Sequence, residues 1–204
     1  MKPSLKRSSL AQLERSEMKV LFKFDKNIPK NTRVIDTTSS SGEFRGLSPF
    51  VLPAPPAKNL ENLWQFSKVY EEYWCDFPPA PSYNWYAWRD AGWADNTARR
   101  YPMGKGAIPI CSWWNEKPLD YIEARKQIYA PEYAKNVVNT NSFYRLWGIY
   151  QDTNTNLILL DYDAYDHQAL GMSLKDVINN PNKKCGHAFV LMMILTGELE
   201  NCLE

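Results

Sequence analysis

Residues 59–68 of the chain read NLENLWQFSK, which predicts a helix with two different faces. Asn59 is a suitable N-cap, and Glu61 in the first turn favours the positive end of the helix dipole. Two stripes run along the helix at helical spacing, an apolar one of Leu60, Leu63, Trp64 and Ser67 and a polar one of Glu61, Gln65, Lys68 and Glu72. The polar stripe is either a solvated face or one wall of a catalytic cleft, and the spacing alone does not separate the two.

The bulk composition indicates a globular protein. The chain has 204 residues, of which 44% are hydrophobic and 23% charged, so we expect a single domain over residues 1–204. The net charge of +1 does not favour a nucleic-acid coat or a membrane-surface protein. No stretch approaches the roughly 20 apolar residues that span a bilayer, and the N-terminus lacks the apolar run of a secretory signal. We expect a cytoplasmic protein without membrane partners, and its oligomeric state stays open.

The cysteines and histidines do not form a recognisable metal motif. The four cysteines are far apart without a CxxC pair, and there are only two histidines, so we expect reduced thiols and neither metal nor cofactor. Cys185 and His187 lie two residues apart on a predicted helix. Because residues i and i+2 of a helix point in different directions, a structural use is favoured over a catalytic dyad.

The remaining elements predict an α+β fold, a mainly helical domain with a small β-sheet and an aromatic-rich insertion. Residues 1–20 suit an N-terminal arm or short helix. Strands are expected over residues 20–24, 32–38 and from 157 onward. Helices are expected from residue 59 to Pro78, over 118–129, from Pro131, over 142–151, from about Ser173, and over the apolar C-terminal residues 185–204.

Residues 76–118 are rich in proline, glycine and tryptophan and show little periodicity. Long irregular segments in a folded domain are usually functional, and the aromatic content predicts an ordered insertion or lid with short helical turns. Arg89, Arg99 and Arg100 lie among its rings, a combination that suits base stacking and phosphate contacts. The alternative is a small hydrophobic core.

Three acidic residues, Asp161, Asp163 and Asp166, follow the buried strand that begins near residue 157. Acids at the end of a strand often lie at a ligand-binding sheet edge, although acidic turns also simply face solvent. Walker-type phosphate loops, GxSxG elbows and HExxH motifs are missing from the sequence.

Several short phrases occur in an order that resembles the NADAR superfamily, the NAD- and ADP-ribose-related N-glycosidases. They are LSPF at 47–50, the Glu61-Gln65-Lys68 spacing, EAR at 123–125, Asp166 shortly before Gly171, and GHAFVLM at 186–192. Asn62 stands where the family usually has histidine, and Leu170 where it has tryptophan. The chain is also similar to a protein group that shares a W-Q-x-x-K-V helix and an EAR-x-x-I-Y phrase and has no assigned activity.

The resemblance implies hydrolysis of a base–ribose N-glycosidic bond in a nucleotide or ADP-ribosyl substrate. Such bonds break through an oxocarbenium-like sugar, which a carboxylate stabilises. The resemblance makes Glu61 and Asp166 the catalytic candidates, and Asp166 would orient water or bind ribose. The expected substrate-binding residues are Gln65, Lys68, Trp93, Arg99, Arg100, Trp113 and Trp114, with Trp64 in the core.

Each predicted binding residue has its own role. Lys68 holds a phosphate or ribose, Arg99 and Arg100 meet a diphosphate or a nucleic-acid backbone, and the insertion tryptophans replace the missing family tryptophan over the base. Two alternatives stay open: a protein that binds a nucleotide or ADP-ribose without cleaving it, and an interaction module that uses the tryptophan-rich insertion.

Overall fold

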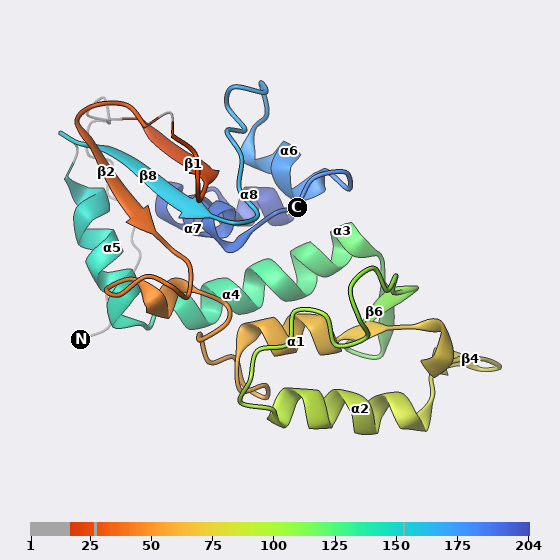
Figure 1. The fold of residues 1–204 in the computed structure, drawn as a ribbon. Helices are drawn as coiled ribbons and strands as arrows, with labels where there is room; N and C mark the ends of the chain where they lie inside the picture. The colour runs from red at the N-terminus through yellow and green to blue at the C-terminus, as the bar shows by residue number, and fades with distance from the viewer. Residues whose placement is uncertain (1–16, 27, 153) are drawn as a thin grey trace.

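The computed structural model describes residues 17–26, 28–152 and 154–204, and it has the predicted mixed α+β fold (Figure 1). Residues 1–16 of the predicted N-terminal arm lie outside the described residues. Residues 18–20 belong to the first strand. The prediction of an arm or helix over residues 1–20 is therefore wrong for these three residues. Within the described residues, no helix is long and apolar enough to cross a membrane.

The main sheet has three parallel strands in the order β1 (Met18–Phe22), β8 (Asn156–Asp161), β2 (Thr32–Asp36). Three of the six β8 side chains are the fully apolar, buried Leu157, Ile158 and Leu159, which suits a central strand covered on both faces. Because all three strands run the same way, their carboxyl ends meet at one edge.

The C-terminal helices cover this sheet. α7 (His187–Thr196) is buried along most of its length and contacts β1 and β8. It ends at Gly197, whose φ of +74° is the left-handed conformation that glycine adopts without strain. The predicted single C-terminal helix is therefore divided into α7 and α8 (Leu199–Leu203). The predicted helices near 142–151 and Ser173 are present as α5 (Asn141–Gln151) and α6 (Leu174–Asn179).

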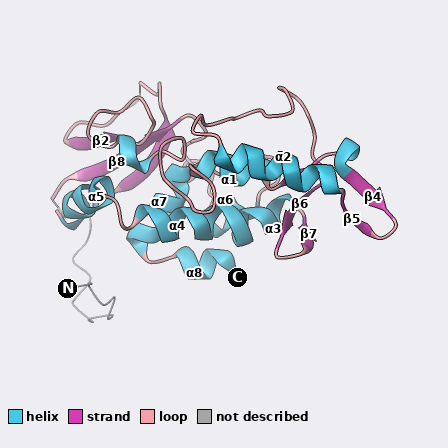
Figure 2. Ribbon diagram, turned by 90° about the horizontal axis from the view of Figure 1, so that it is seen from below, coloured by secondary structure: helices cyan, strands magenta, loops and turns pink. Residues whose placement is uncertain are grey.

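One long helix over residues 121–137 connects the two sides of the molecule. It consists of α3 (Tyr121–Ala124), the π-helical η3 (Arg125–Tyr129) and α4 (Ala130–Val137). The predicted break before Pro131 is wrong, because the wide π turn ends at Tyr129, two residues before the proline, and the chain stays helical. Figures 1 and 2 show α1 and α2 on one side of this helix, and Figure 2 shows α8 on the other.

The helix at NLENLWQFSK is α1 (Leu60–Phe66), and it is shorter than predicted. The Asn59 cap is confirmed, since its side chain accepts from the Asn62 N–H at 2.8 Å. After Phe66 the backbone turns into β3 (Lys68–Val69), which pairs with β6 (Cys111–Trp114). The short elements nearby are η1 (Arg45–Leu47), η2 (Glu71–Tyr73), β4 (Trp74–Asp76), β5 (Pro79–Pro81) and β7 (Lys117–Leu119).

The insertion at 76–118 is ordered, but it contains a helix of 12 residues, α2 (Tyr83–Ala94), instead of short turns. Only Trp85 and Gly92 are buried on α2, so little of this helix belongs to the core. α2 packs closely on α1: a Cβ added to Gly92 would lie 2.0 Å from the Phe66 ring. Only glycine fits at this contact.

Candidate active site

A cavity of about 450 Å³ lies at the carboxyl edge of the sheet. The loops that follow β2 and β8 form part of its wall, together with α1, the long helix and the segment before α7. Residues 48–50 and 100–101 also line it. Ligand sites at the carboxyl ends of parallel strands are common in α/β proteins, and this volume lies in the range of small-molecule sites. Segments from seven parts of the chain therefore converge on one candidate site.

Four of the predicted site residues line this cavity: Glu61, Gln65, Lys68 and Arg100. Glu61 is 7% exposed and Gln65 is 8% exposed, so the polar stripe of α1 is a cavity wall and not a solvated face. Trp64, expected in the core, also lines the cavity while its ring packs on Tyr129 at 5.3 Å between centroids.

Glu61, Gln65 and Lys68 form a chain of hydrogen bonds. The Gln65 Nε2 donates to Glu61 Oε1 at 2.9 Å, and the Lys68 Nζ donates to Gln65 Oε1 at 2.7 Å. Because Glu61 only accepts when ionised and Lys68 only donates, the two neighbours determine which way the Gln65 amide points. Lys68 reaches back from β3 although it lies beyond the helix.

Burial shifts the ionisation of both ends of this chain. Burial raises the pKa of Glu61, an effect that the Gln65 hydrogen bond and the Arg100 and Lys68 charges partly offset. Burial lowers the pKa of Lys68 to about 8, and the charge of Glu61 works in the opposite direction. A carboxylate and an amine with perturbed pKa values in one cavity are typical of functional sites.

We expect the Lys68 ammonium to titrate near pH 8, well below the ordinary lysine pKa of about 10.4. Glu61→Gln is expected to lower the Lys68 pKa further, because it removes the negative charge that favours protonation. Nitrogen-15 NMR of the lysine side chains measures both values. A Lys68 pKa near the ordinary value of about 10.4 contradicts the predicted burial effect.

A second charged group at the cavity is centred on Asp163. Its carboxylate accepts from Arg100 Nη2 at 2.7 Å and from Lys184 Nζ at 2.7 Å. Two cations therefore meet at one carboxylate, on an open part of the wall where all three side chains retain solvent contact. An anionic group of a ligand would find both cations within one small area.

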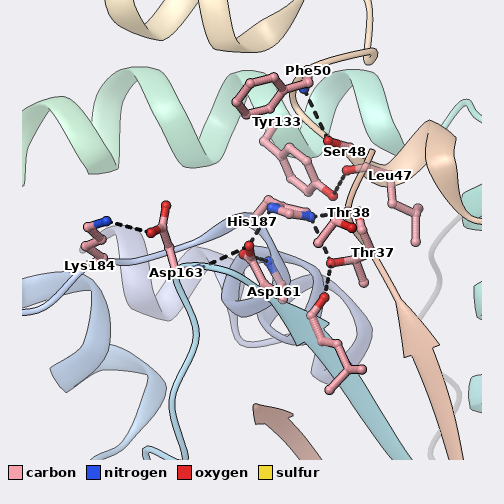
Figure 3. Close-up of polar contacts among 12 residues, drawn as sticks. Thr37, Thr38, Leu47, Ser48, Phe50, Tyr133, Asp161, Asp163, Lys184 and His187 are labelled. Atoms are coloured by element: carbon pink, nitrogen blue, oxygen red, sulfur yellow. Dashed lines mark hydrogen bonds and ion pairs between the residues drawn. The ribbon is translucent and has the colours of Figure 1, made fainter. Parts of the chain in front are cut away.

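A third, deeper group is the buried pair of Asp161 and His187 (Figure 3). The His187 Nδ1 lies 3.0 Å from Asp161 Oδ2, and its Nε2 lies 2.9 Å from the Thr37 carbonyl oxygen and 2.8 Å from Thr37 Oγ1. The Thr37 hydroxyl donates its hydrogen to the Leu160 carbonyl oxygen. The Thr37 Oγ1 and the Thr37 carbonyl oxygen are therefore both acceptors toward the His187 ring. When Asp161 is ionised both ring nitrogens face acceptors, and the ring that satisfies them is a protonated imidazolium.

The pKa values of this pair agree with that assignment. Burial alone would raise the pKa of Asp161, but the charge and hydrogen bond of His187 lower it to about 2. Burial opposes protonation of His187, yet Asp161 raises the pKa of the imidazole above its usual value. Gly186 allows this packing, because a Cβ there would lie 2.2 Å from Asp161 Oδ2.

Five predicted site residues do not line the cavity. Asp166 pairs with Lys19 of β1 at 3.2 Å and accepts from the Ala169 N–H, so the turn after Asp163 carries it away from Glu61. Arg99 instead pairs with Asp95 at 2.8 Å. Trp93, Trp113 and Trp114 are half-buried and pack against other rings and the core. No insertion tryptophan therefore replaces the family tryptophan at this site.

Asn62, at the position where the family usually has histidine, holds the insertion in place. Its Nδ2 donates to the carbonyl oxygens of Asp95 and Thr97, both at 3.0 Å, and its Oδ1 accepts from the Arg99 N–H at 2.7 Å. Asn62 is fully buried. These three bonds fix the backbone directly before Arg100 and so place Arg100 at the cavity.

The sequence analysis missed several cavity residues. Tyr121, Arg125 and Tyr129 lie four residues apart on the long helix and line one side of the cavity, and this spacing was the available signal. Arg125 donates to the carbonyl oxygens of Asn180 and Lys183 and so anchors the segment that carries Lys184.

Cys185 lines the cavity but does not form a catalytic dyad with His187. Burial raises the pKa of the Cys185 thiol to about 12, so it is protonated at neutral pH and a poor nucleophile. Both nitrogens of His187 are already engaged. Among the described residues, no group of three His, Cys, Asp or Glu side chains is placed to hold a metal ion.

Comparison with known proteins adds no identity: no family model, no curated protein and no solved structure matches this chain. The resemblance to NADAR proteins therefore stays a prediction from the motifs.

Proposed function

We propose that the protein is an N-glycosidase-like hydrolase that cleaves the base–ribose bond of a nucleotide or ADP-ribosyl substrate. ADP-ribosylated guanine in nucleic acid is one candidate substrate. The observation that supports the proposal most directly is the buried carboxylate of Glu61 in the cavity wall, tied through Gln65 to Lys68. A reaction with an oxocarbenium-like transition state needs a negative charge held beside the sugar.

The charges and rings around Glu61 suit the rest of such a substrate. The side chains of Arg100 and Lys184 are two cations that can bind a phosphate of the substrate. The phosphate would compete with Asp163, which binds both cations in the structure. Phe50, Trp64 and Tyr101 add aromatic surface to the same cavity for a flat base. The proposal involves no metal or cofactor and places the protein in the cytoplasm.

Asp163 takes over the role that the sequence suggested for Asp166, to orient water or bind a ribose hydroxyl. It lies close enough for its charge to raise the pKa of Glu61.

A second candidate function is nucleotide or ADP-ribose binding without cleavage. The observation that favours it is that Asp161 and Asp163, the other carboxylates at the cavity, are both already engaged in ion pairs. A site in which Glu61 is the one cavity carboxylate outside an ion pair would bind a nucleotide more readily than it would activate water.

One assay separates the two functions. The protein is incubated with ADP-ribosylated guanosine, an ADP-ribosylated DNA oligonucleotide, NAD and a ribosylaminopyrimidine phosphate, and released base is detected by liquid chromatography. Released base from any of them supports the hydrolase. A thermal shift without released base supports the binding protein, and neither effect contradicts both and leaves an interaction module.

A further inference from the structure

Tyr129 is one of the aromatic residues that line the cavity. It is the last residue of the π turn and lines the cavity between the α1 side, which carries Glu61, and the sheet edge, which carries Asp161. The charges of both carboxylates reach its hydroxyl, since both contribute to its ionisation behaviour. Tyr129 is therefore near both acids, one of which is the proposed catalytic group.

The ring of Tyr129 is held firmly. It packs against Trp64 at 5.3 Å and stacks with Tyr133 at 6.5 Å, and the residue is only 9% exposed. A tyrosine fixed by rings on both sides presents its hydroxyl in one direction, so little freedom is lost when a ligand binds to it.

The hydroxyl of Tyr129 makes no hydrogen bond to any other residue that the structure describes. Tyr129 lines the cavity and keeps 9% of its surface exposed. Two neighbouring hydroxyls on the same helix are engaged: Tyr121 accepts from Arg125 at 2.7 Å, and Tyr133 donates to the Leu47 carbonyl at 2.7 Å. Buried polar groups normally have partners, and one that faces a cavity without a partner marks a contact with a ligand.

We propose that Tyr129 is a further catalytic residue, whose hydroxyl donates a hydrogen bond to the base as it leaves the sugar. The inference rests on the proposed hydrolysis and specifies its leaving group: a base with an acceptor oxygen or nitrogen next to the bond that breaks. Burial, together with the Asp161 and Glu61 charges, raises the pKa of Tyr129 well above 10, so the hydroxyl stays protonated as a donor at any working pH.

The reaction balances without a proton from Tyr129. The bond between the sugar C1′ and the base nitrogen breaks, and its electron pair moves onto the base. The oxygen of water bonds to C1′, Glu61 takes one proton from that water, and this proton passes through solvent to the base. Tyr129 stabilises the negative charge that develops on the base, as donors in an oxyanion hole do.

The test compares Tyr129→Phe with Tyr133→Phe, which removes the same atom one helical turn away, outside the cavity. With any substrate that the wild type cleaves, Tyr129→Phe is expected to lower kcat by about 10²–10³-fold. KM is expected to change by less than about threefold. The loss grows for bases that are poorer leaving groups, and the melting temperature stays unchanged. Tyr133→Phe retains kcat within about twofold but melts earlier, because it leaves the Leu47 carbonyl without its donor.

The two proposals fail in different ways. If the wild type releases base and Tyr129→Phe does so equally fast, the role of Tyr129 is overturned and the hydrolase stands. If the wild type cleaves none of the substrates, the hydrolase is overturned. Tyr129 then remains a base-binding donor only if Tyr129→Phe binds guanosine monophosphate about tenfold more weakly while ribose 5-phosphate binds unchanged. Equal binding of guanosine monophosphate by wild type and variant overturns that role too.

Discussion

Glu61→Gln is expected to lower the rate of base release by about 10²–10⁴-fold, the range for loss of a positioned acid or base. Glutamine keeps the shape of the side chain and still accepts the hydrogen bond from Gln65, but it carries no charge to stabilise an oxocarbenium-like sugar. The measurement is single-turnover release of base from whichever substrate the wild type cleaves.

Loss of stability is not expected to explain this effect. Because burial raises the pKa of Glu61 in the folded protein, the folded state binds its proton more tightly than the unfolded state. Ionised Glu61 therefore costs stability above pH 4.5, its ordinary pKa, and this cost increases until the pH passes the folded-state pKa. Glutamine removes this cost because it carries no charge. At pH 7 the variant should therefore melt at the same temperature as the wild type or at a higher one.

Glu72→Gln is the matched control, since Glu72 is exposed and lies outside the cavity. It should keep wild-type turnover. Equal rates for Glu61→Gln and the wild type would exclude Glu61 from the chemistry, whereas a Glu61→Gln protein that binds substrate but releases no base supports it.

The second large effect concerns the buried pair of Asp161 and His187. Asp161→Asn is expected to lower the free energy of unfolding by about 3–5 kcal/mol, because an imidazolium loses its counter-charge in the interior. Chemical denaturation at pH 6 measures the change. Asp163→Asn makes the same substitution two residues away on partly exposed ion pairs, where we expect about 1 kcal/mol or less. Similar losses in the two variants would contradict a charged, buried pair.

The pH dependence follows from the direction of each shift. The pKa of Asp161 is about 2 in the folded protein, against 3.8 ordinarily, so its contribution is complete above pH 4 and lost as the pH falls toward 2. The raised pKa of His187 gives a contribution that is complete below pH 6.5 and lost as the pH rises through the folded value. The pair thus stabilises most between about pH 4 and 6.5, and Asp161→Asn should remove this maximum.

Local features of the sequence were sufficient for part of the site. The Asn59 cap and the spacing of Glu61, Gln65 and Lys68 depend on residues within one short segment, and the structure places them as expected on one wall. The single apolar run of β8 likewise predicted the central strand.

The wrong predictions depended on contacts between distant segments. Arg99 and Arg100 are adjacent, and which of them reaches the cavity is decided by Asn62, whose amide binds the Arg99 backbone. Likewise, Asp166 leaves the site because Lys19 of a neighbouring strand binds it. No periodicity contains this information.

The buried pair shows the same limit. His187 resembles an ordinary residue of an apolar helix until Asp161, 26 positions earlier in the chain, is brought beside it. Pro131 is a related case. The helix continues through it because a π turn precedes it, and no simple sequence pattern predicts that turn.

The position of β8 in the sheet has a consequence for synthesis on the ribosome. β1 and β2 do not pair with each other, and the strand that joins them is made about 120 residues after β2. Until residue 161 has left the ribosomal tunnel, the sheet cannot close and the cavity lacks Asp161, Lys184 and His187. Contacts over such separations form late. A fragment that stops before β8 should therefore bind no ligand, and binding to a nascent chain would report that the cavity residues through His187 have left the ribosome.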